Sequence, residues 1–490
     1  MWKKLLFPKK VHNFVHSFKK ACNFMDTEFL RRRKTSVAQV GLLAIGGDNP
    51  IRIQSMATVD TNDTEGCVAQ AKRIIDAGGE LVRFTTQGTR EAKNMANISQ
   101  RLKADGYSQP LVADVHFNAN VADVAAQLCE KVRINPGNYI DPARTFKHLE
   151  YTDDEYAAEL KRLDERLVAF ISICKEHKTA VRIGVNHGSL SDRIMSRYGD
   201  TPEGIVESCM EFLRIFKREQ FDDVVISIKA SNTVVMVQSV RLLVKQMDAE
   251  DMRYPLHLGV TEAGEGEDGR IKSAVGIGAL LTEGIGDTIR VSLSEEPEAE
   301  IPVARKLVEL IPECTQLRQE AEKSIEDDTI SLVIWASDMD TLMLKAAMSV
   351  GALLIDRKAT KLVLKPLGLT KPVPASAITL LADAILQAAR VKFTKTEYIS
   401  CPGCGRTLYN LQETIAKIKA ATSHLVGLKI GIMGCIVNGP GEMADADYGY
   451  VGAGRGKISL YRGKECVEKN IPEEEAVEHL LQLIHEDKHI

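Results

Sequence analysis

Three cysteines and one glutamate near the end of the 490-residue chain have the types and spacing of a metal centre. Cys401 and Cys404 flank a Pro-Gly turn in CPGC, a spacing that can direct both sulfurs at one centre. Cys435 and Glu442 lie in GCIVNGPGE, where the Gly-Pro-Gly bend turns the carboxylate back toward the third sulfur. Three sulfur ligands and one oxygen ligand suit an iron–sulfur cluster in which one iron has a harder, more exchangeable ligand. The alternative is a structural zinc turn at CPGC and an unrelated buried Cys435, because structural zinc prefers four Cys or His ligands.

A second set of candidate residues is cationic, and each member lies in a short apolar run. They are Arg83, Arg133, Arg182, Lys229 and Arg290. Five cations around one site would repel one another in a low-dielectric cavity unless an anion lies among them. A small di- or triphosphorylated molecule meets that need, because each charge-assisted hydrogen bond is worth roughly 1.5–3 kcal/mol. The neutral donors that we expect beside it are Asn135, Asn186, Ser227 and Ser292.

Two carboxylates and one histidine accompany these cations. Asp114 and His116 stand two residues apart in one apolar run, so on a strand they share a side. We interpret them as a hydrogen-bonded pair that positions substrate or an arginine, with a metal-binding pair as the alternative. Glu262 is the carboxylate at the end of the seventh run, and we interpret it as a proton donor to a leaving oxygen. Its alternative role is to neutralise a neighbouring arginine.

The elements that must position these residues recur from residue 50 to 295. Short β-rich runs alternate with helical stretches, and the eight runs are 51–56, 81–85, 111–117, 132–135, 181–186, 224–229, 256–262 and 288–292. This alternation predicts an α/β fold with a parallel sheet, and eight units in this length predict a TIM (β/α)₈ barrel. An open doubly wound sheet is the alternative. In a barrel, the five cations would lie at the C-terminal ends of the strands, where barrel active sites form.

The remaining residues predict four regions. These are a basic N-terminal extension (1–35), the barrel (36–299), a small α/β insertion (300–395) and a C-terminal α+β iron–sulfur domain (396–490). We interpret the first 23 residues as a disordered tail or as sequence upstream of a start at Met25, with a membrane-surface helix as the alternative. The acidic run 295–300 is expected to be a solvated start of a helix.

The composition is that of an ordinary globular protein, with 44% hydrophobic residues, 27% charged residues and a net charge of −4. This balance gives no reason to expect nucleic acid as a partner. The ten cysteines include six scattered in apolar or helical contexts, which favour the reduced thiols of a cytoplasmic protein. The sequence contains no run of about 18 apolar residues, so we expect no membrane span.

Motifs in both halves of the chain resemble one known family. They are VRINPGN (132–138), VRIGVNHGS (181–189), GVTEAG (259–264), GIGDTIRVS (284–292), CPGC (401–404) and GCIVNGPGE (434–442). The chain resembles the 4-hydroxy-3-methylbut-2-enyl diphosphate synthases of the non-mevalonate isoprenoid pathway. It is similar to their plant-like type, with a shortened insertion. In the short type the cysteine domain of one subunit caps the barrel of another, whereas in the long type the extra domain is a spacer that lets one chain close on itself. We favour a homodimer here.

The resemblance implies an oxidoreductase that opens the ring of 2-C-methyl-D-erythritol 2,4-cyclodiphosphate by reduction and dehydration. It implies a [4Fe–4S] cluster held by Cys401, Cys404, Cys435 and Glu442, and two electrons from ferredoxin or flavodoxin. Glu262 matches the acid of the family. The residues that match diphosphate-binding positions are Arg83, Arg133, Asn135, Arg182, Asn186, Lys229, Arg290 and Ser292.

Two other classes of function remain open from the residues alone. One is a barrel transferase, for example of the pterin type, with a structural zinc domain. The other is an electron-transfer or iron-sensing protein whose barrel is a scaffold. The content of iron and acid-labile sulfide separates the first alternative from a cluster enzyme, and substitution of the barrel cations separates the second.

Overall fold

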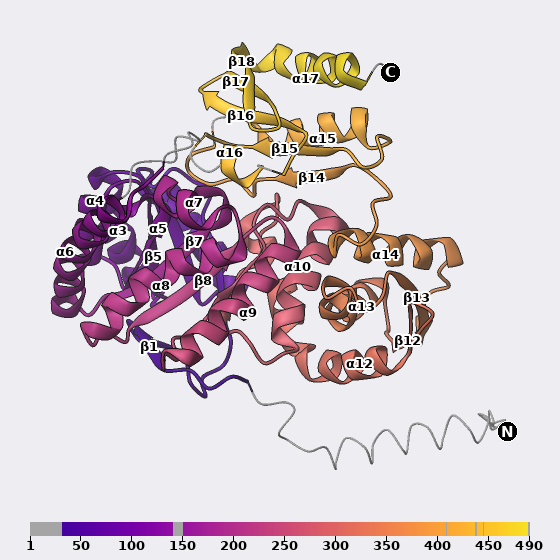
Figure 1. The fold of residues 1–490 in the computed structure, drawn as a ribbon, viewed down its shortest axis with the longest axis horizontal. Coiled ribbons are helices and arrows are strands. Elements are labelled where there is room, and N and C mark those ends of the chain that lie inside the picture. Colours follow the sequence, from indigo (N-terminus) through magenta and orange to yellow (C-terminus); the bar gives the residue numbers. More distant parts are fainter. Residues whose placement is uncertain (1–31, 141–149, 408, 437–438, 444, 489–490) are drawn as a thin grey trace.

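A computed structural model describes residues 32–140, 150–407, 409–436, 439–443 and 445–488. The first 31 residues of the predicted N-terminal extension therefore lie outside the described part of the chain. Figure 1 shows the barrel, the insertion beside it, and the C-terminal domain above both.

Eight parallel strands form the barrel, and they are β3 (Arg52–Met56), β4 (Leu81–Thr86), β5 (Leu111–Val115), β6 (Lys131–Ile134), β7 (Ala180–Asn186), β8 (Val224–Lys229), β9 (His257–Leu258) and β10 (Thr288–Ile289). Their order is β8-β7-β6-β5-β4-β3-β10-β9, and a parallel bridge between Ile226 and Leu256 joins the two ends into a ring. The barrel prediction is confirmed, and the doubly wound alternative is wrong. In the seventh and eighth runs only two residues each pair as strand.

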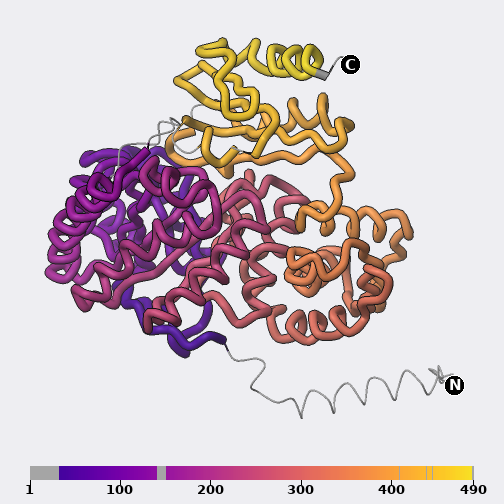
Figure 2. Tube along the Cα trace, in the orientation of Figure 1, coloured from indigo at the N-terminus to yellow at the C-terminus, as the bar shows by residue number. Residues whose placement is uncertain are grey.

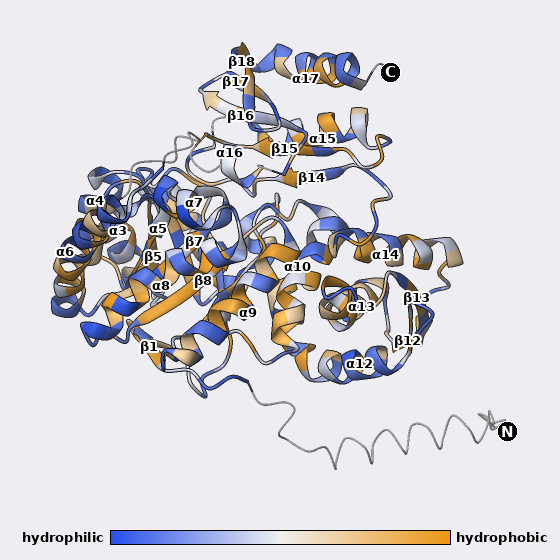
Figure 3. Ribbon diagram, in the orientation of Figure 1, coloured by the Kyte–Doolittle hydropathy of each residue, from blue (hydrophilic) through white to orange (hydrophobic). Residues whose placement is uncertain are grey.

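The helices outside this ring are α2 (Thr64–Asp76), α3 (Thr89–Ala104), α4 (Ala119–Ala126), α5 (Pro136–Tyr139), α6 (Asp153–His177), α7 (Asp192–Tyr198), α8 (Pro202–Arg218), α9 (Thr233–Ala249), α10 (Gly266–Leu281) and α11 (Glu300–Glu309), with the 3₁₀ turns η1 (His187–Ser189) and η2 (Pro297–Ala299). Several start at an asparagine that follows a strand: Asn118, Asn135, Asn186 and Asn232 are N-caps whose side chains accept a backbone N–H. Figure 3 shows apolar residues concentrated on inner elements such as β8.

A β-hairpin closes the N-terminal end of the barrel. Its strands are β1 (Val37–Val40) and β2 (Leu43–Gly46), paired antiparallel. Ala38, Val40 and Ile45 are fully buried in one cluster with residues that begin the barrel strands, such as Leu81. This hairpin was not predicted, because two four-residue strands leave little periodic signal in the sequence.

The insertion contains α12 (Ile311–Lys323), β11 (Ile325–Glu326), β12 (Thr329–Trp335), α13 (Met339–Ile355), β13 (Lys361–Leu367) and α14 (Ala375–Ala388). The strands form a three-stranded sheet in which β12 and β13 are parallel. Helix α13 crosses α10 of the barrel closely, since a Cβ on Gly278 would lie 2.5 Å from the side chain of Met348. One hydrophobic core therefore continues from the barrel into the insertion.

The C-terminal domain is an α+β unit with its own core. It contains β14 (Glu397–Ser400), α15 (Leu411–Thr422), β15 (Lys429–Met433), α16 (Gly439–Glu442), β16 (Tyr448–Gly454), β17 (Lys457–Arg462), β18 (Glu465–Pro472) and α17 (Glu473–Lys488). The strand order follows the chain, with three parallel strands and then two antiparallel pairings. Figure 2 shows this domain lying over the barrel of the same chain. Among the described helices, none is long and apolar enough to cross a membrane.

Candidate active site

The cysteine loops dock directly onto the C-terminal end of the barrel. Gly188 in η1 and Gly441 in α16 pack backbone to backbone, because a Cβ on Gly441 would lie 1.6 Å from the carbonyl oxygen of Gly188. Beside this contact, Ser294 Oγ donates a hydrogen bond of 2.9 Å to the carbonyl oxygen of Cys401. The bridge between Ala263 and Ser400 adds a strand-like pairing across the interface. The CPGC turn and the GPGE bend are thus held over the barrel mouth.

A cavity lies between the two domains. Of the predicted site residues, its wall includes Arg83, Asp114, His116, Arg133, Arg182, Asn186, Lys229, Glu262, Arg290, Ser292, Cys401, Cys404 and Cys435. The residues come from seven barrel strands or the loops after them, and from the two cysteine loops. The structure therefore brings the two predicted sets into one site.

Arg290 is neutralised by a buried carboxylate. Its Nε and Nη2 donate to the two oxygens of Glu300 at 3.1 and 3.0 Å, and Ser55 Oγ donates to the same carboxylate at 2.7 Å. Although burial opposes it, Glu300 raises the pKa of Arg290 above its usual value. Glu300 is only 1% exposed, so the prediction of a solvated acidic run is wrong at this residue. Its partner lies ten residues earlier, directly after β10.

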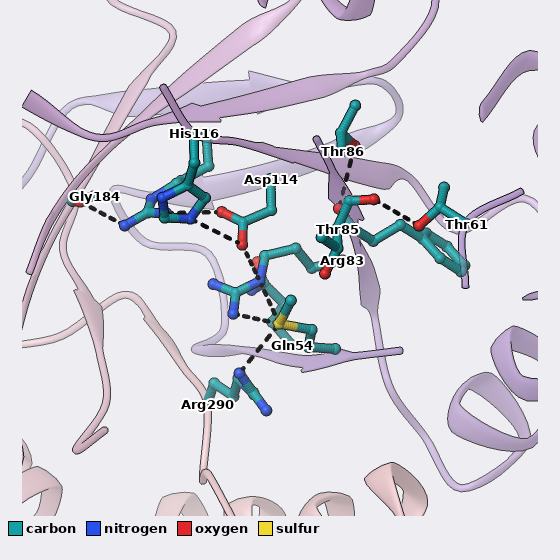
Figure 4. A network of polar contacts seen from close by, with 12 residues as sticks. Gln54, Thr61, Arg83, Thr85, Thr86, Asp114, His116, Gly184 and Arg290 are labelled. Carbon is teal, nitrogen blue, oxygen red and sulfur yellow. Dashed lines mark hydrogen bonds and ion pairs between the residues drawn. The ribbon is translucent and has the colours of Figure 1, made fainter. Parts of the chain in front are cut away.

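Asp114 lies between two arginines and His116 (Figure 4). Arg133 Nη1 donates to Asp114 Oδ1 at 2.9 Å, while Arg83 Nε and His116 Nε2 lie 3.8 and 3.5 Å from Oδ2. Despite burial, the two arginines hold the pKa of Asp114 well below its usual range. Burial and Arg133 lower the pKa of His116 to about 3, so the imidazole is neutral. This arrangement fits the interpretation of a pair that positions an arginine.

Glycine in the VRIGVN motif makes room for one of these arginines. Arg133 Nη2 donates to the carbonyl oxygen of Gly184 at 2.7 Å. A Cβ on Gly184 would lie 2.1 Å from Arg133 Nε, so a larger residue would displace the guanidinium. The glycine of this motif is thus explained by Arg133 on the neighbouring strand.

Arg182 and Lys229 differ from the paired cations. Arg182 is 1% exposed, and its Nε and Nη1 are buried without a hydrogen-bond partner. Burial and the cations Arg83 and Arg133 lower the pKa of Arg182 well below its usual value. Burial and Arg290 do the same to the pKa of Lys229. An anionic ligand between these groups would remove the electrostatic cost of both.

Glu262 and Glu442 lie close enough to affect each other's protonation. Glu262 adopts a left-handed conformation (φ 48°), which costs energy for a residue with a side chain and often marks a functional site. Its Oε2 is buried without a partner, and burial raises the pKa of Glu262 to about 7. Glu442 is 4% exposed and neither carboxylate oxygen has a hydrogen-bond partner. Burial and Glu262 raise the pKa of Glu442 well above its usual value.

The sulfur donors suit a cluster better than a single ion. Cys401 and Cys404 are free thiols, and the N–H of Gly403 donates to Cys401 Sγ at 3.3 Å. Cys435 lines the same cavity. Within the described ranges, no group of three or more His, Cys, Asp or Glu residues is gathered tightly enough for one metal ion. An iron–sulfur cluster spans several atoms and uses more widely spaced ligands, so three nearby sulfurs and the orphaned Glu442 carboxylate fit it.

Three residues differ from the prediction in their placement. Glu442 is not on the cavity wall, although it interacts with Glu262, which is. Asn135 does not line the cavity; its Nδ2 donates to Ser189 Oγ at 2.7 Å and its side chain caps α5. Arg406, which was not predicted, lines the cavity from the cysteine domain. Its place two residues after Cys404 is a signal in the sequence that could have identified it.

Two family profiles match the chain. That of the GcpE TIM-barrel domain matches residues 35–305, and that of the GcpE protein C-terminal domain matches residues 397–486. The chain belongs to the GcpE family. The resemblance identified in the sequence is therefore confirmed. The segment between the two matches is the insertion.

Relatives within the GcpE family carry one enzyme name, 4-hydroxy-3-methylbut-2-en-1-yl diphosphate synthase (flavodoxin). The protein of that name from Bacteroides fragilis is 51% identical over 607 aligned positions, covering 94% of this chain and 96% of that protein. The one from Porphyromonas gingivalis is 46% identical over 582 positions, covering 94% and 99%. Both alignments exceed the 490 residues of this chain, so these relatives contain segments without a counterpart here.

Proposed function

We propose that this chain catalyses the reductive ring opening and dehydration of 2-C-methyl-D-erythritol 2,4-cyclodiphosphate to 4-hydroxy-3-methylbut-2-enyl diphosphate. The observation that carries the proposal is one cavity lined by five cations from the barrel and by three cysteines from the C-terminal domain. The enzyme name of the close relatives describes the same product.

The barrel cations bind the diphosphate group. Arg182 and Lys229 contribute most, because burial and like charges disfavour their charged forms until an anion is present. Arg83, Arg133 and Arg290 are already oriented by Asp114 and Glu300, so they are held in place before the ligand arrives. Asn186 and Ser292 supply neutral donors on the same wall.

Cys401, Cys404, Cys435 and Glu442 would hold a [4Fe–4S] cluster. Support comes from the three sulfurs on one cavity and from the buried Glu442 carboxylate, which interacts with Glu262 on the cavity wall. When bound, such a cluster supplies low-potential electrons one at a time. A flavodoxin in the cytoplasm is the proposed donor, in keeping with the name of the relatives.

Glu262 supplies a proton. The reaction consumes two electrons, breaks a C–O bond of the cyclic diphosphate and releases one hydroxyl oxygen as water. That departing oxygen needs a proton, and Glu262 Oε2 lies in a buried, unpartnered position with a raised pKa, which lets the carboxyl hold one. The docked cysteine domain excludes bulk water from this position, since Glu262 is 7% exposed.

The experiment is an anaerobic turnover assay with the cyclodiphosphate and an artificial one-electron donor, together with iron and acid-labile sulfide analysis of the same protein. We expect product formation that depends on the donor, with iron and sulfide in near-equal amounts. Stoichiometric zinc without sulfide, and no turnover, would instead support the barrel transferase with a structural zinc domain.

A further inference from the structure

Arg406 occupies a fixed position in the roof of the cavity. The backbone N–H of Thr407 donates to the carbonyl oxygen of Cys404 at 2.9 Å, and the N–H of Cys404 donates to Thr407 Oγ1 at 3.0 Å. On the other side of this turn, a Cβ on Gly405 would lie 2.9 Å from the carbonyl oxygen of Val59 in the barrel. The turn is therefore held by both domains, and its arginine side chain lines the cavity.

Arg406 makes no ion pair with the described residues, although the charges of Asp114 and the cysteines favour its cationic form. Its Nε and Nη1 are buried and have no hydrogen-bond partner. The groups that face it are the three cysteines and Asp114, and Asp114 already accepts from Arg133 and lies beside Arg83. Among the described residues of the cysteine domain, Arg406 is the one charged side chain on the cavity wall.

A buried guanidinium with two unpartnered nitrogens on the cavity wall can donate hydrogen bonds to an anionic ligand in the cavity. Arg406 and the unpaired barrel cation Arg182 line the same cavity from the two domains. We propose that Arg406 binds a phosphate oxygen of the ligand from the cysteine-domain side, so that one diphosphate group bridges the two domains. This inference rests on the proposed function, whose substrate and product both carry a diphosphate. With this contact, the cysteine domain would bind the ligand in addition to its assigned role in electron transfer.

The test is calorimetric binding of inorganic diphosphate to the anaerobically purified holoenzyme. Arg406→Gln should weaken binding about tenfold to a hundredfold, the loss expected for one charge-assisted hydrogen bond. The matched control is Arg455→Gln, an exposed arginine of the same domain, and its affinity should equal that of the wild type. Wild-type affinity in Arg406→Gln would overturn the inference.

The variant lies two residues from Cys404, so cluster absorbance and the thermal midpoint are measured on each preparation. If Arg406→Gln loses cluster, Arg406→Lys becomes the deciding variant, because it keeps the charge. Affinity close to the wild type in Arg406→Lys, with the cluster retained, supports the phosphate contact. Loss of affinity as great as in Arg406→Gln overturns it.

A bridging ligand should also change the interface. Saturating diphosphate should slow amide hydrogen exchange at residues 187–189 in the wild type and have a smaller effect in Arg406→Gln. Equal slowing in both proteins would overturn the bridge. A turnover assay distinguishes a failure of this inference from a failure of the proposed function. Arg406-dependent diphosphate binding without turnover of the cyclodiphosphate refutes the proposed function alone, whereas turnover with Arg406-independent binding refutes this inference alone.

Discussion

The two walls of the cavity differ in whether their charged side chains have partners within the protein. On the barrel wall, most of the cations have a carboxylate partner inside the protein. Arg290 pairs with Glu300, and Asp114 pairs with Arg133 and Arg83. On the opposite side, two nitrogens of Arg406 have no hydrogen-bond partner among the described residues.

The difference indicates which parts are preorganised and which await a ligand. Paired side chains hold a fixed geometry for the substrate and lose little on binding. Unpaired buried groups carry a desolvation cost that only a bound group can offset. The paired barrel cations therefore resemble a finished binding surface, whereas Arg182, Lys229 and the cysteine wall await the proposed ligand and cluster.

The largest effect on turnover is expected from a cysteine of the C-terminal domain. Cys404→Ser should abolish turnover, because the serine oxygen is a poor ligand for an iron–sulfur cluster. Iron and sulfide content should fall while the barrel still unfolds cooperatively. Cys466→Ser is the matched control, since Cys466 is a free cysteine of the same domain away from the cavity wall. Unchanged iron and sulfide content in Cys404→Ser would contradict the proposal that Cys404 is a cluster ligand.

The second-largest effect on turnover is expected at Glu262. Glu262→Gln should lower kcat about 10²–10⁴-fold, because the amide keeps the shape but has no acidic proton. Cluster absorbance and diphosphate affinity should be unchanged. The control is Glu265→Gln, which alters a partly exposed ion pair with Lys419. Full turnover in Glu262→Gln would remove this residue from the mechanism.

Breaking a matched pair should act on stability rather than chemistry. Glu300→Gln leaves Arg290 buried without its counter-ion, and we expect a loss of about 3–5 kcal/mol in the free energy of unfolding. Glu298→Gln removes a more exposed partner of Arg73 and should cost less than about 1 kcal/mol. Denaturant titration of both variants measures the contrast, and equal small losses would show that the pair does not organise the wall.

The smallest effect is expected from a single unpaired barrel cation. Arg182→Gln should weaken diphosphate binding about tenfold to a hundredfold. It should leave the unfolding free energy near or above the wild-type value, because a buried like charge is removed. Arg101→Gln, in an exposed pair with Glu65, is the control. A large loss of stability in Arg182→Gln would mean that this cation has a structural partner.

The sequence predicted what depends on local pattern. All eight barrel strands, and most helices of the insertion and C-terminal domain, follow from apolar periodicity. Both candidate sets line one cavity because barrel strands all end at the same face. The motif residues were identifiable because cations and cysteines are unusual within apolar runs and tight turns.

What the sequence could not predict depends on partners brought from elsewhere. Glu300 looks like any acid in an exposed helix start until Arg290 is placed beside it. Strands β14, β16 and β18 give little signal in the sequence, because β14 has four residues and the others contain glycines or charges that dilute the strand pattern. The docking of the cysteine domain on its own barrel depends on the fit between Gly188 and Gly441, which no local pattern reveals.

The central claim is that the cationic mouth and the cysteine loops of one chain form one site. The direct measurement is complementation in trans, in which Cys404→Ser and Arg182→Gln chains are unfolded together, refolded with iron and sulfide, and assayed for turnover. Sites formed within single chains predict no more activity than the sum of the separately treated variants. A clear rise above that sum would show that the cluster of one chain serves the barrel of another, and would contradict the account.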